Sequence, residues 1–235
     1  MNGLMMFKGS PRVSREELKY ISTPMSTHSW KPVPHYEIAE MIADEAKARN
    51  FDILSEEYGL NPAGTKMFGV LRFQPDGHPE YARALGIRNS NDKQLALGMT
   101  AGVSVFVCEN LCFHGTSIVY RKHTSGIRLR EVIPEAFDRI ELQYAALDVR
   151  ITTLKSERVS INEARITVVM AAEIRAIPSC DIIEVLEEFR EPRHEEFSLP
   201  NKWSLYNSFT ETAKKYSPAR ADKCYRGLAQ IFDLK

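Results

Sequence analysis

Polar and ionisable side chains are concentrated between Gly86 and Thr124, where they alternate with short β-like runs. One group precedes a strand-like run and comprises Arg88, Asn89, Asn91, Asp92 and Lys93. A second group follows that run and comprises Glu109, Asn110, His114, Arg121, Lys122 and His123. This number of polar and ionisable residues is high for ordinary surface loops. Any chemistry of the chain is therefore expected in this segment.

Cations and an aromatic residue in this segment are typical of a nucleic-acid-binding surface. Proteins that bind single strands combine cations, which contact phosphates, with aromatic rings, on which bases stack. An edge strand protected from aggregation by its charges would carry the same residue types, so both interpretations stay open. The candidate nucleic-acid-binding residues are Arg88, Lys93, Tyr120, Arg121, Lys122 and His123.

A metal-dependent reaction is the alternative for the same segment. Asp92, Glu109 and His123 could hold Mg²⁺ for phosphodiester hydrolysis, since magnesium prefers oxygen ligands. The sequence contains no nucleophile elbow, glycine-rich phosphate loop or His-Glu-x-x-His pair, which leaves the commonest hydrolase signatures unmatched. The leading hypothesis therefore involves neither an enzyme nor a cofactor, and a magnesium-dependent nuclease or other hydrolase is kept as the rival.

Two further sets of residues have simpler explanations. The spacing of Cys108, Cys112, His114 and His123 is not one of the strong zinc-finger patterns, so no metal site is predicted. The amides of Asn89, Asn91 and Asn110 lie at turn positions, where side chains commonly cap the backbone. A structural role in turns is therefore predicted for these asparagines.

The pattern of apolar residues predicts an α+β fold with the elements in blocks. Residues 1–34 are rich in proline and are expected to form an extended arm, and the following acidic segment is expected to be a helix over 35–49. Strands are predicted over 51–58, 65–73, 82–90, 103–110 and 116–124 and form an antiparallel β-meander. The meander strand over 103–110 is apolar on both faces and should be central.

Helical periodicity dominates the rest of the chain. Helices are predicted over 132–155, 160–176, 179–190, 203–215 and 219–232. The expected organisation is an arm over 1–34, a helix plus β-meander core over 35–131, and a helical region over 132–235 that packs on the core.

Composition indicates an ordinary globular protein with an uneven charge distribution. The 235 residues carry 31 basic and 31 acidic side chains. Residues 36–62 have a net charge of −5, whereas residues 63–131 have a net charge of +4. No apolar run approaches the roughly 20 residues that a spanning helix needs. A cytoplasmic protein with no membrane partner and reduced cysteines is predicted.

Several blocks resemble one family of phage- and plasmid-encoded proteins. They are RNSNDKQLALGMTAGVSVFVCENLCFHG, then RKHT, then WSLYNSFTETAKKY near the C-terminus. These blocks are similar to the family labelled domain of unknown function 932 (DUF932). Asn91 stands where that family often has a histidine. The resemblance implies a mobile-element setting beside antirestriction and DNA-repair functions, and it implies no catalytic assignment.

We therefore expect a phage or mobile-element DNA-metabolism protein that binds single-stranded DNA. Its element order suggests a single-strand annealing or recombination protein, which would act as a homo-oligomer. A third hypothesis is an inhibitor that binds a host defence protein through the acidic helix over 35–49 and the arm.

Overall fold

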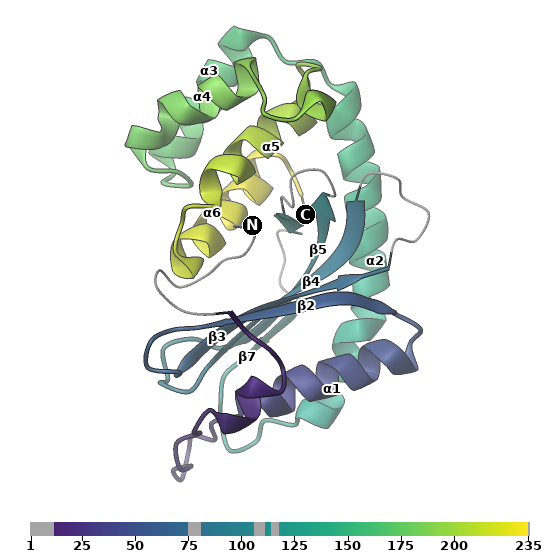
Figure 1. Cartoon of the computed structure of the whole chain (residues 1–235), viewed down its shortest axis with the longest axis vertical. Coiled ribbons are helices and arrows are strands. Elements are labelled where there is room, and N and C mark those ends of the chain that lie inside the picture. The colour runs from purple at the N-terminus through teal and green to yellow at the C-terminus, as the bar shows by residue number, and fades with distance from the viewer. Residues whose placement is uncertain (1–11, 75–80, 106–110, 114–117, 235) are drawn as a thin grey trace.

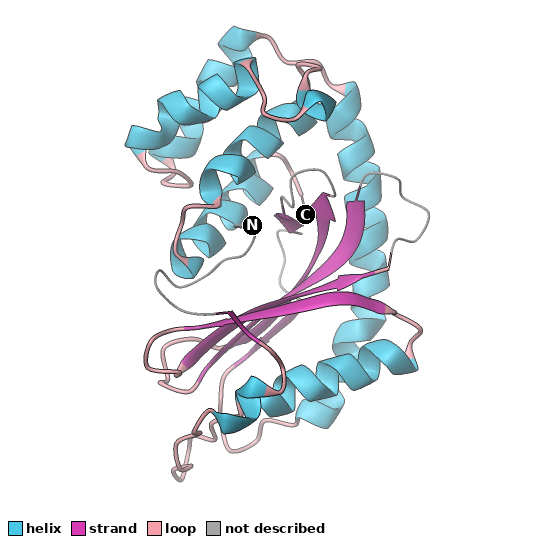
Figure 2. Ribbon diagram, viewed as in Figure 1, coloured by secondary structure: helices cyan, strands magenta, loops and turns pink. Residues whose placement is uncertain are grey.

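The chain forms an antiparallel sheet with helices packed on both faces (Figures 1 and 2). We describe a computed structural model over residues 12–74, 81–105, 111–113 and 118–234. Seven strands are described, in the order β1-β2-β3-β4-β5-β6, with β7 also pairing with β5. The α+β class predicted from the sequence is confirmed.

Strands β1 to β6 follow one another in the sheet as they do in the chain, whereas β7 pairs with β5. The central strands β3–β5 are buried along most of their length because both faces of the sheet are covered, whereas β2 is buried only at its end. The bounds are β1 Arg12–Val13, β2 Ile53–Leu60, β3 Lys66–Phe73, β4 Tyr81–Ser90, β5 Leu97–Val105, β6 Leu111–Phe113 and β7 Val119–Arg121.

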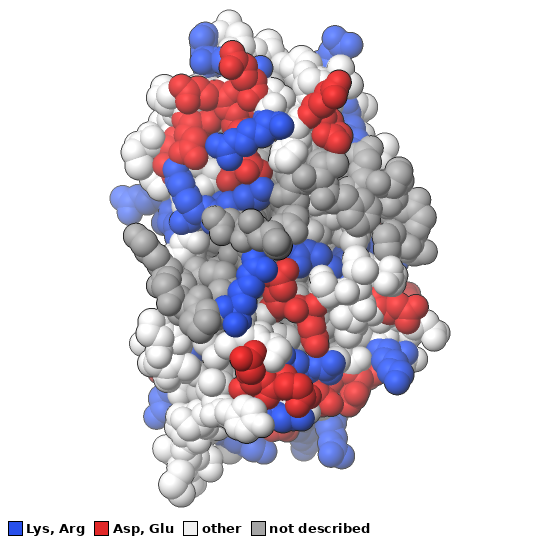
Figure 3. All heavy atoms as spheres, in the orientation of Figure 1, with Lys and Arg blue, Asp and Glu red and all other residues white. Residues whose placement is uncertain are grey.

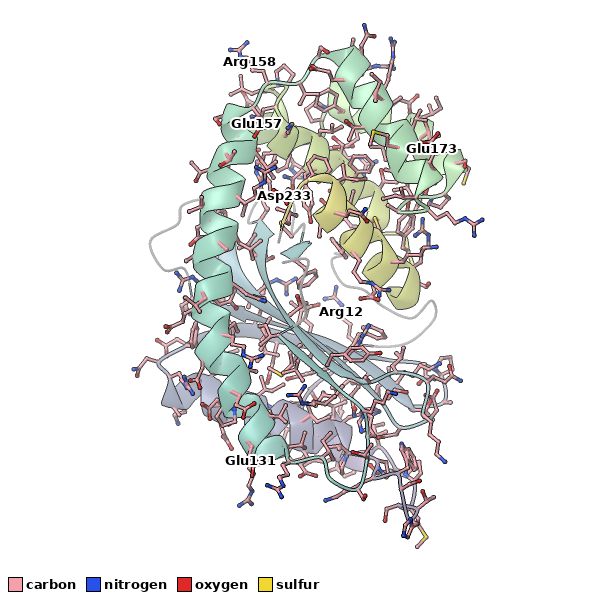
Figure 4. The ribbon with its side chains drawn as sticks, turned by 180° about the vertical axis from the view of Figure 1, so that it is seen from behind. Arg12, Glu131, Glu157, Arg158, Glu173 and Asp233 are labelled. Atoms are coloured by element: carbon pink, nitrogen blue, oxygen red, sulfur yellow. The ribbon has the colours of Figure 1, made fainter. Side chains whose placement is uncertain are left out.

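One face of the sheet packs on two helices, α1 (His35–Ala48) and α2 (Leu129–Ser156). Helix α1 buries a stripe that includes Ile38 and Ile42, as its apolar spacing predicts. From α2, the Tyr144 hydroxyl donates a hydrogen bond of 2.9 Å to the Ala84 carbonyl oxygen. Figure 4 shows α2 running along most of the length of the molecule, so one helix contributes to both the sheet core and the helical region.

The C-terminal helices form a second layer over the opposite face of the sheet (Figure 1). An ion pair of 3.3 Å joins Arg88 on β4 to Asp222 on α6, and the Phe113 ring of β6 meets the Tyr225 ring at 5.3 Å. These helices are α3 Ile161–Glu173, α4 Ile182–Arg190, α5 Lys202–Ala213 and α6 Pro218–Ile231. They match the predicted helices to within a few residues.

Strand β5 begins at Leu97, six residues before the predicted start at Val103. Its first half contains Gly98 and Gly102, which have low strand propensity, so the pattern of apolar residues did not reveal it. Both glycines are needed for close approach: a Cβ on Gly102 would lie 2.5 Å from Phe113 Cδ1. The predicted residues 106–110 of this strand lie outside the described part of the chain.

The described part of the arm lies against the rest of the molecule. It contains β1, which pairs with β2, and a short 3₁₀ helix over Glu17–Tyr20. Further along, Trp30 forms an antiparallel bridge with Thr124. The arm thus runs from β2, with which β1 pairs, to the segment that follows β7, with which Trp30 pairs, before α1 begins.

Candidate functional site

A group of exposed cations and aromatic rings surrounds β7, which we call the basic edge. The bridge between Trp30 and Thr124 and a 3.2 Å hydrogen bond from Lys31 N to the His123 carbonyl oxygen bring the arm beside β7. The ammonium of Lys93 lies 4.8 Å from the centre of the Trp30 ring. The basic edge comprises Trp30, Lys31, Lys93, Tyr120, Arg121 and Lys122.

The cations of the basic edge are available for binding. Lys31, Lys93, Arg121 and Lys122 are all exposed. No carboxylate of a described residue lies within 4.0 Å of any of them, whereas most other described arginines of the sheet are paired. Tyr120, which precedes Arg121 in the chain, is 58% exposed. Unpaired cations beside an exposed ring form a surface suited to a phosphate backbone and a stacked base.

Arg88 is a largely buried residue that contacts Tyr120 of the basic edge. Register pairing aligns Arg88, Gly98 and Tyr120 across β4, β5 and β7. The Arg88 side chain lies directly over Gly98 of β5. A Cβ on Gly98 would lie 2.7 Å from Arg88 Nε, so only glycine leaves room for this side chain. The guanidinium lies 5.6 Å from the Tyr120 ring centre and pairs with Asp222, and its side chain is only 17% exposed. Arg88 therefore orients Tyr120 while its charge is already paired.

Asp92 organises the turn between β4 and β5. Its Oδ1 accepts hydrogen bonds from the Ser90 hydroxyl and, at 3.1 Å, from Gln94 N. Its Oδ2 accepts from the Thr65 hydroxyl and the Lys66 ammonium, both at 3.3 Å. Burial opposes ionisation, but these donors together lower the pKa of Asp92 below its ordinary value. The carboxylate is thus fully engaged in holding the loop that carries Lys93.

We expect Asp92→Ala to lower the free energy of unfolding by about 1–3 kcal/mol, because several buried or half-buried donors would lose their acceptor. Urea denaturation followed by circular dichroism measures this change. Asp52→Ala is the matched control, since Asp52 is exposed and its carboxylate has no described partner. Equal stability of the two variants would contradict this structural role.

A buried polar cluster fixes the arm beneath the basic edge. Asn91 Oδ1 accepts a hydrogen bond of 3.2 Å from Val33 N, and Asn89 Nδ2 donates one of 2.9 Å to the Val33 carbonyl oxygen. Asn89 Nδ2 also lies 2.9 Å from His35 Nδ1, whose ring donates from Nε2 to the Gly64 carbonyl oxygen at 3.0 Å. Asn89 and Asn91 therefore bind the arm instead of capping turns, which corrects the role predicted from the sequence.

His123 belongs to the interior rather than to the basic edge. Only 5% of its surface is exposed, and burial lowers its pKa below the ordinary value. Its ring has no hydrogen-bond partner among the described residues. His123 thus reaches no phosphate in this conformation, although its backbone holds the arm.

The structure describes two of the three candidate catalytic residues. Asp92 is engaged in its turn and His123 is buried, while Glu109 lies outside the described residues. Cys108, Asn110 and His114 also lie outside them. Over residues 12–74, 81–105, 111–113 and 118–234, no group of three or more histidine, cysteine, aspartate or glutamate side chains could hold a metal ion.

Comparison with protein families matches residues 25–231 to the family described as "Domain of unknown function (DUF932)". This chain is a DUF932 protein. The match begins just before Trp30 and ends in α6, so the DUF932 region contains the whole basic edge. Searches of curated proteins and of solved structures each found no match.

The DUF932 protein has a contrasting surface on α1 and α2. A groove of about 490 Å³ between these helices is lined partly by Glu37, Asp44 and Glu45, with Arg130 on the α2 side. Acidic side chains also gather over the end of the molecule that carries α4 (Figure 3). The negative charge of the groove disfavours a phosphate backbone at this place.

In the described portion of this DUF932 protein, no helix combines the length and the apolar character needed to cross a membrane. The longest, α2, carries charged residues along much of its length.

Proposed function

We propose that the protein binds single-stranded nucleic acid through the basic edge. The observation that carries this proposal is that Lys31, Lys93, Arg121 and Lys122 are exposed and lack described carboxylate partners, and that the ring of Tyr120, which precedes Arg121 in the chain, is exposed as well. The setting proposed for this activity is DNA metabolism of a phage or other mobile element in the host cytoplasm, and the resemblance drawn from the sequence supports it.

Each part of the basic edge has a distinct role in this proposal. The cations of Arg121 and Lys122 contact phosphates through charge-assisted hydrogen bonds, while Lys31 and Lys93 extend the positive surface along the arm. Tyr120 stacks on a base, and Arg88 holds its ring from the other side. Stacking favours a single strand, because its bases are not held in base pairs and can stack on a protein ring.

The test is Arg121→Ala combined with Lys122→Ala. We expect the affinity for labelled single-stranded DNA to fall about tenfold or more at low salt, since charge-assisted contacts are each worth about 1.5–3 kcal/mol. The slope of log K against log salt should fall by about 1.4, because each lost phosphate contact on a single strand contributes about 0.7. Fluorescence anisotropy over a salt titration, with a chelator present, gives both values.

The matched control is Arg139→Ala combined with Arg158→Ala. Both arginines are exposed, and no described carboxylate pairs with either, so the total charge changes equally. Figure 4 shows Arg158 near the end of α2 that is remote from Glu131. Equal losses in the two double variants would show that net charge, and not the basic edge, determines binding. Absence of binding by the unmodified protein at low salt would overturn the proposal.

A further inference from the structure

Helix α3 is apolar on both of its faces. Its inward face buries Ala164, Val168 and Ala171 against the neighbouring helices. Its outward face exposes larger side chains: Ile166 is 61% exposed, and Met170 is 49% exposed. Large apolar side chains exposed next to one another commonly mark a surface that binds another protein.

The exposed residues form two neighbouring rows along α3. Residues four apart stack above one another on a helix and form such rows. The first row, Ile166, Met170 and the C-cap residue Ile174, is apolar throughout, with Ile174 44% exposed. The second row has an apolar centre and oppositely charged ends, and it consists of Arg165, Val169 and Glu173.

We infer that α3 pairs with α3 of a second copy of this chain, antiparallel and about a two-fold axis near Val169 and Met170. The order of the charges along the second row, positive at one end and negative at the other, indicates that the partner is a second copy of the same helix. In an antiparallel pair, Arg165 of one copy lies beside Glu173 of the other, and the same contact is repeated by symmetry. The first row then places Ile166 against Ile174 and Met170 against its own copy.

The charged ends are free to make these contacts. Within the described residues, Glu173 has no cationic partner, and Arg165 donates only to Asn162 Oδ1, at 3.0 Å. Figure 4 shows Glu173 on the outer side of α3, away from the body of the molecule. On α4, which packs beside α3, Ile183 adds another large exposed apolar side chain (62%).

The pairing is independent of the proposed nucleic-acid binding. Helix α3 lies at the end of the molecule opposite to α1 (Figure 1), and none of the residues of the basic edge belongs to it. Two copies joined through α3 keep both basic edges accessible. Failure of either proposal therefore leaves the other intact.

The first experiment measures the mass of the full chain by light scattering after gel filtration, over a wide range of concentration. We expect a dimer for the unmodified protein. Met170→Glu should raise its dissociation constant about a hundredfold, because two carboxylates would meet at the two-fold axis. Leu142→Glu is the matched control, since Leu142 is 74% exposed on α2, and it should leave the dimer unchanged.

The second experiment exploits the charge order. Arg165→Glu and Glu173→Arg should each weaken the dimer, since each places like charges opposite one another. Mixing these two variants should restore association, because every cross-pair is then attractive. Circular dichroism checks that each variant is folded. A monomer at all concentrations, a dimer indifferent to Met170→Glu, or a mixture of the two charge variants that fails to associate would overturn the inference and assign this face to another protein.

Discussion

Replacing Gly102 with alanine is expected to lower the free energy of unfolding by about 3 kcal/mol, at the upper end of the usual cost of overpacking. A Cβ at this position would lie 2.5 Å from Phe113 Cδ1 and 2.7 Å from the Cys112 carbonyl oxygen. The ring could rotate aside, but the carbonyl belongs to β6, which pairs with β5 at this point. The two strands would have to separate to make room for a methyl group.

Urea denaturation of Gly102→Ala tests this expectation. Gly126→Ala is the matched control, because a Cβ there would have no atom within 4 Å. Gly126→Ala should be nearly neutral, since open space accepts the methyl group and the unfolded chain loses some conformational freedom. Similar midpoints for the two variants would mean that β6 does not pack on β5 as described.

Acidification is expected to destabilise the protein over the range in which His35 gains a proton on unfolding. Burial lowers the pKa of His35 to about 4, although the hydrogen bond to Gly64 opposes the shift. An unfolded histidine has a pKa near 6.5, so the unfolded state binds more protons between these values. The contribution of His35 to the free energy of unfolding should be fully present above about pH 6.5. The free energy of unfolding should fall by about 3 kcal/mol as the pH approaches 4. Burial also lowers the pKa of His123, which adds to the loss.

The measurement is the free energy of unfolding by urea at about pH 7.5 and about pH 4.5. His35→Gln should reduce the difference between the two values, because glutamine does not titrate, although the variant will be less stable overall. His28→Gln is the control, because it makes the same substitution at an exposed histidine. If His35→Gln and the unmodified protein lost equal stability on acidification, His35 would not be buried as described.

The helices could be predicted because their apolar residues recur every three to four positions within a short segment of the chain. The apolar stripe containing Ile38 and Ile42 located α1. The capping box of Ser160 and Glu163 at the start of α3 was found only in the structure. Strand β5 was only half located, because Gly98 and Gly102 lack the side chains that mark a strand. The need for glycine arises from Arg88 and Phe113, which approach from neighbouring strands and could not be identified from local pattern.

The basic edge was predictable in part. Tyr120, Arg121 and Lys122 are consecutive in the chain, so composition alone singled them out. The aromatic residue Trp30 was missed, because its place beside Lys93 depends on contacts between segments far apart in the sequence. Burial separated His123 from the group, and an ion pair with α6 engaged Arg88. Neither property can be seen in a single sequence.

The order of the strands has a consequence for the folding pathway. Each strand from β1 to β6 pairs with its successor in the chain, so most of the sheet can form from neighbouring hairpins without closing long loops. The contacts of Val33 with Asn89 and of Trp30 with Thr124 instead join distant segments. Docking of the arm is therefore expected to be a late step, which completes the basic edge only after the sheet has formed.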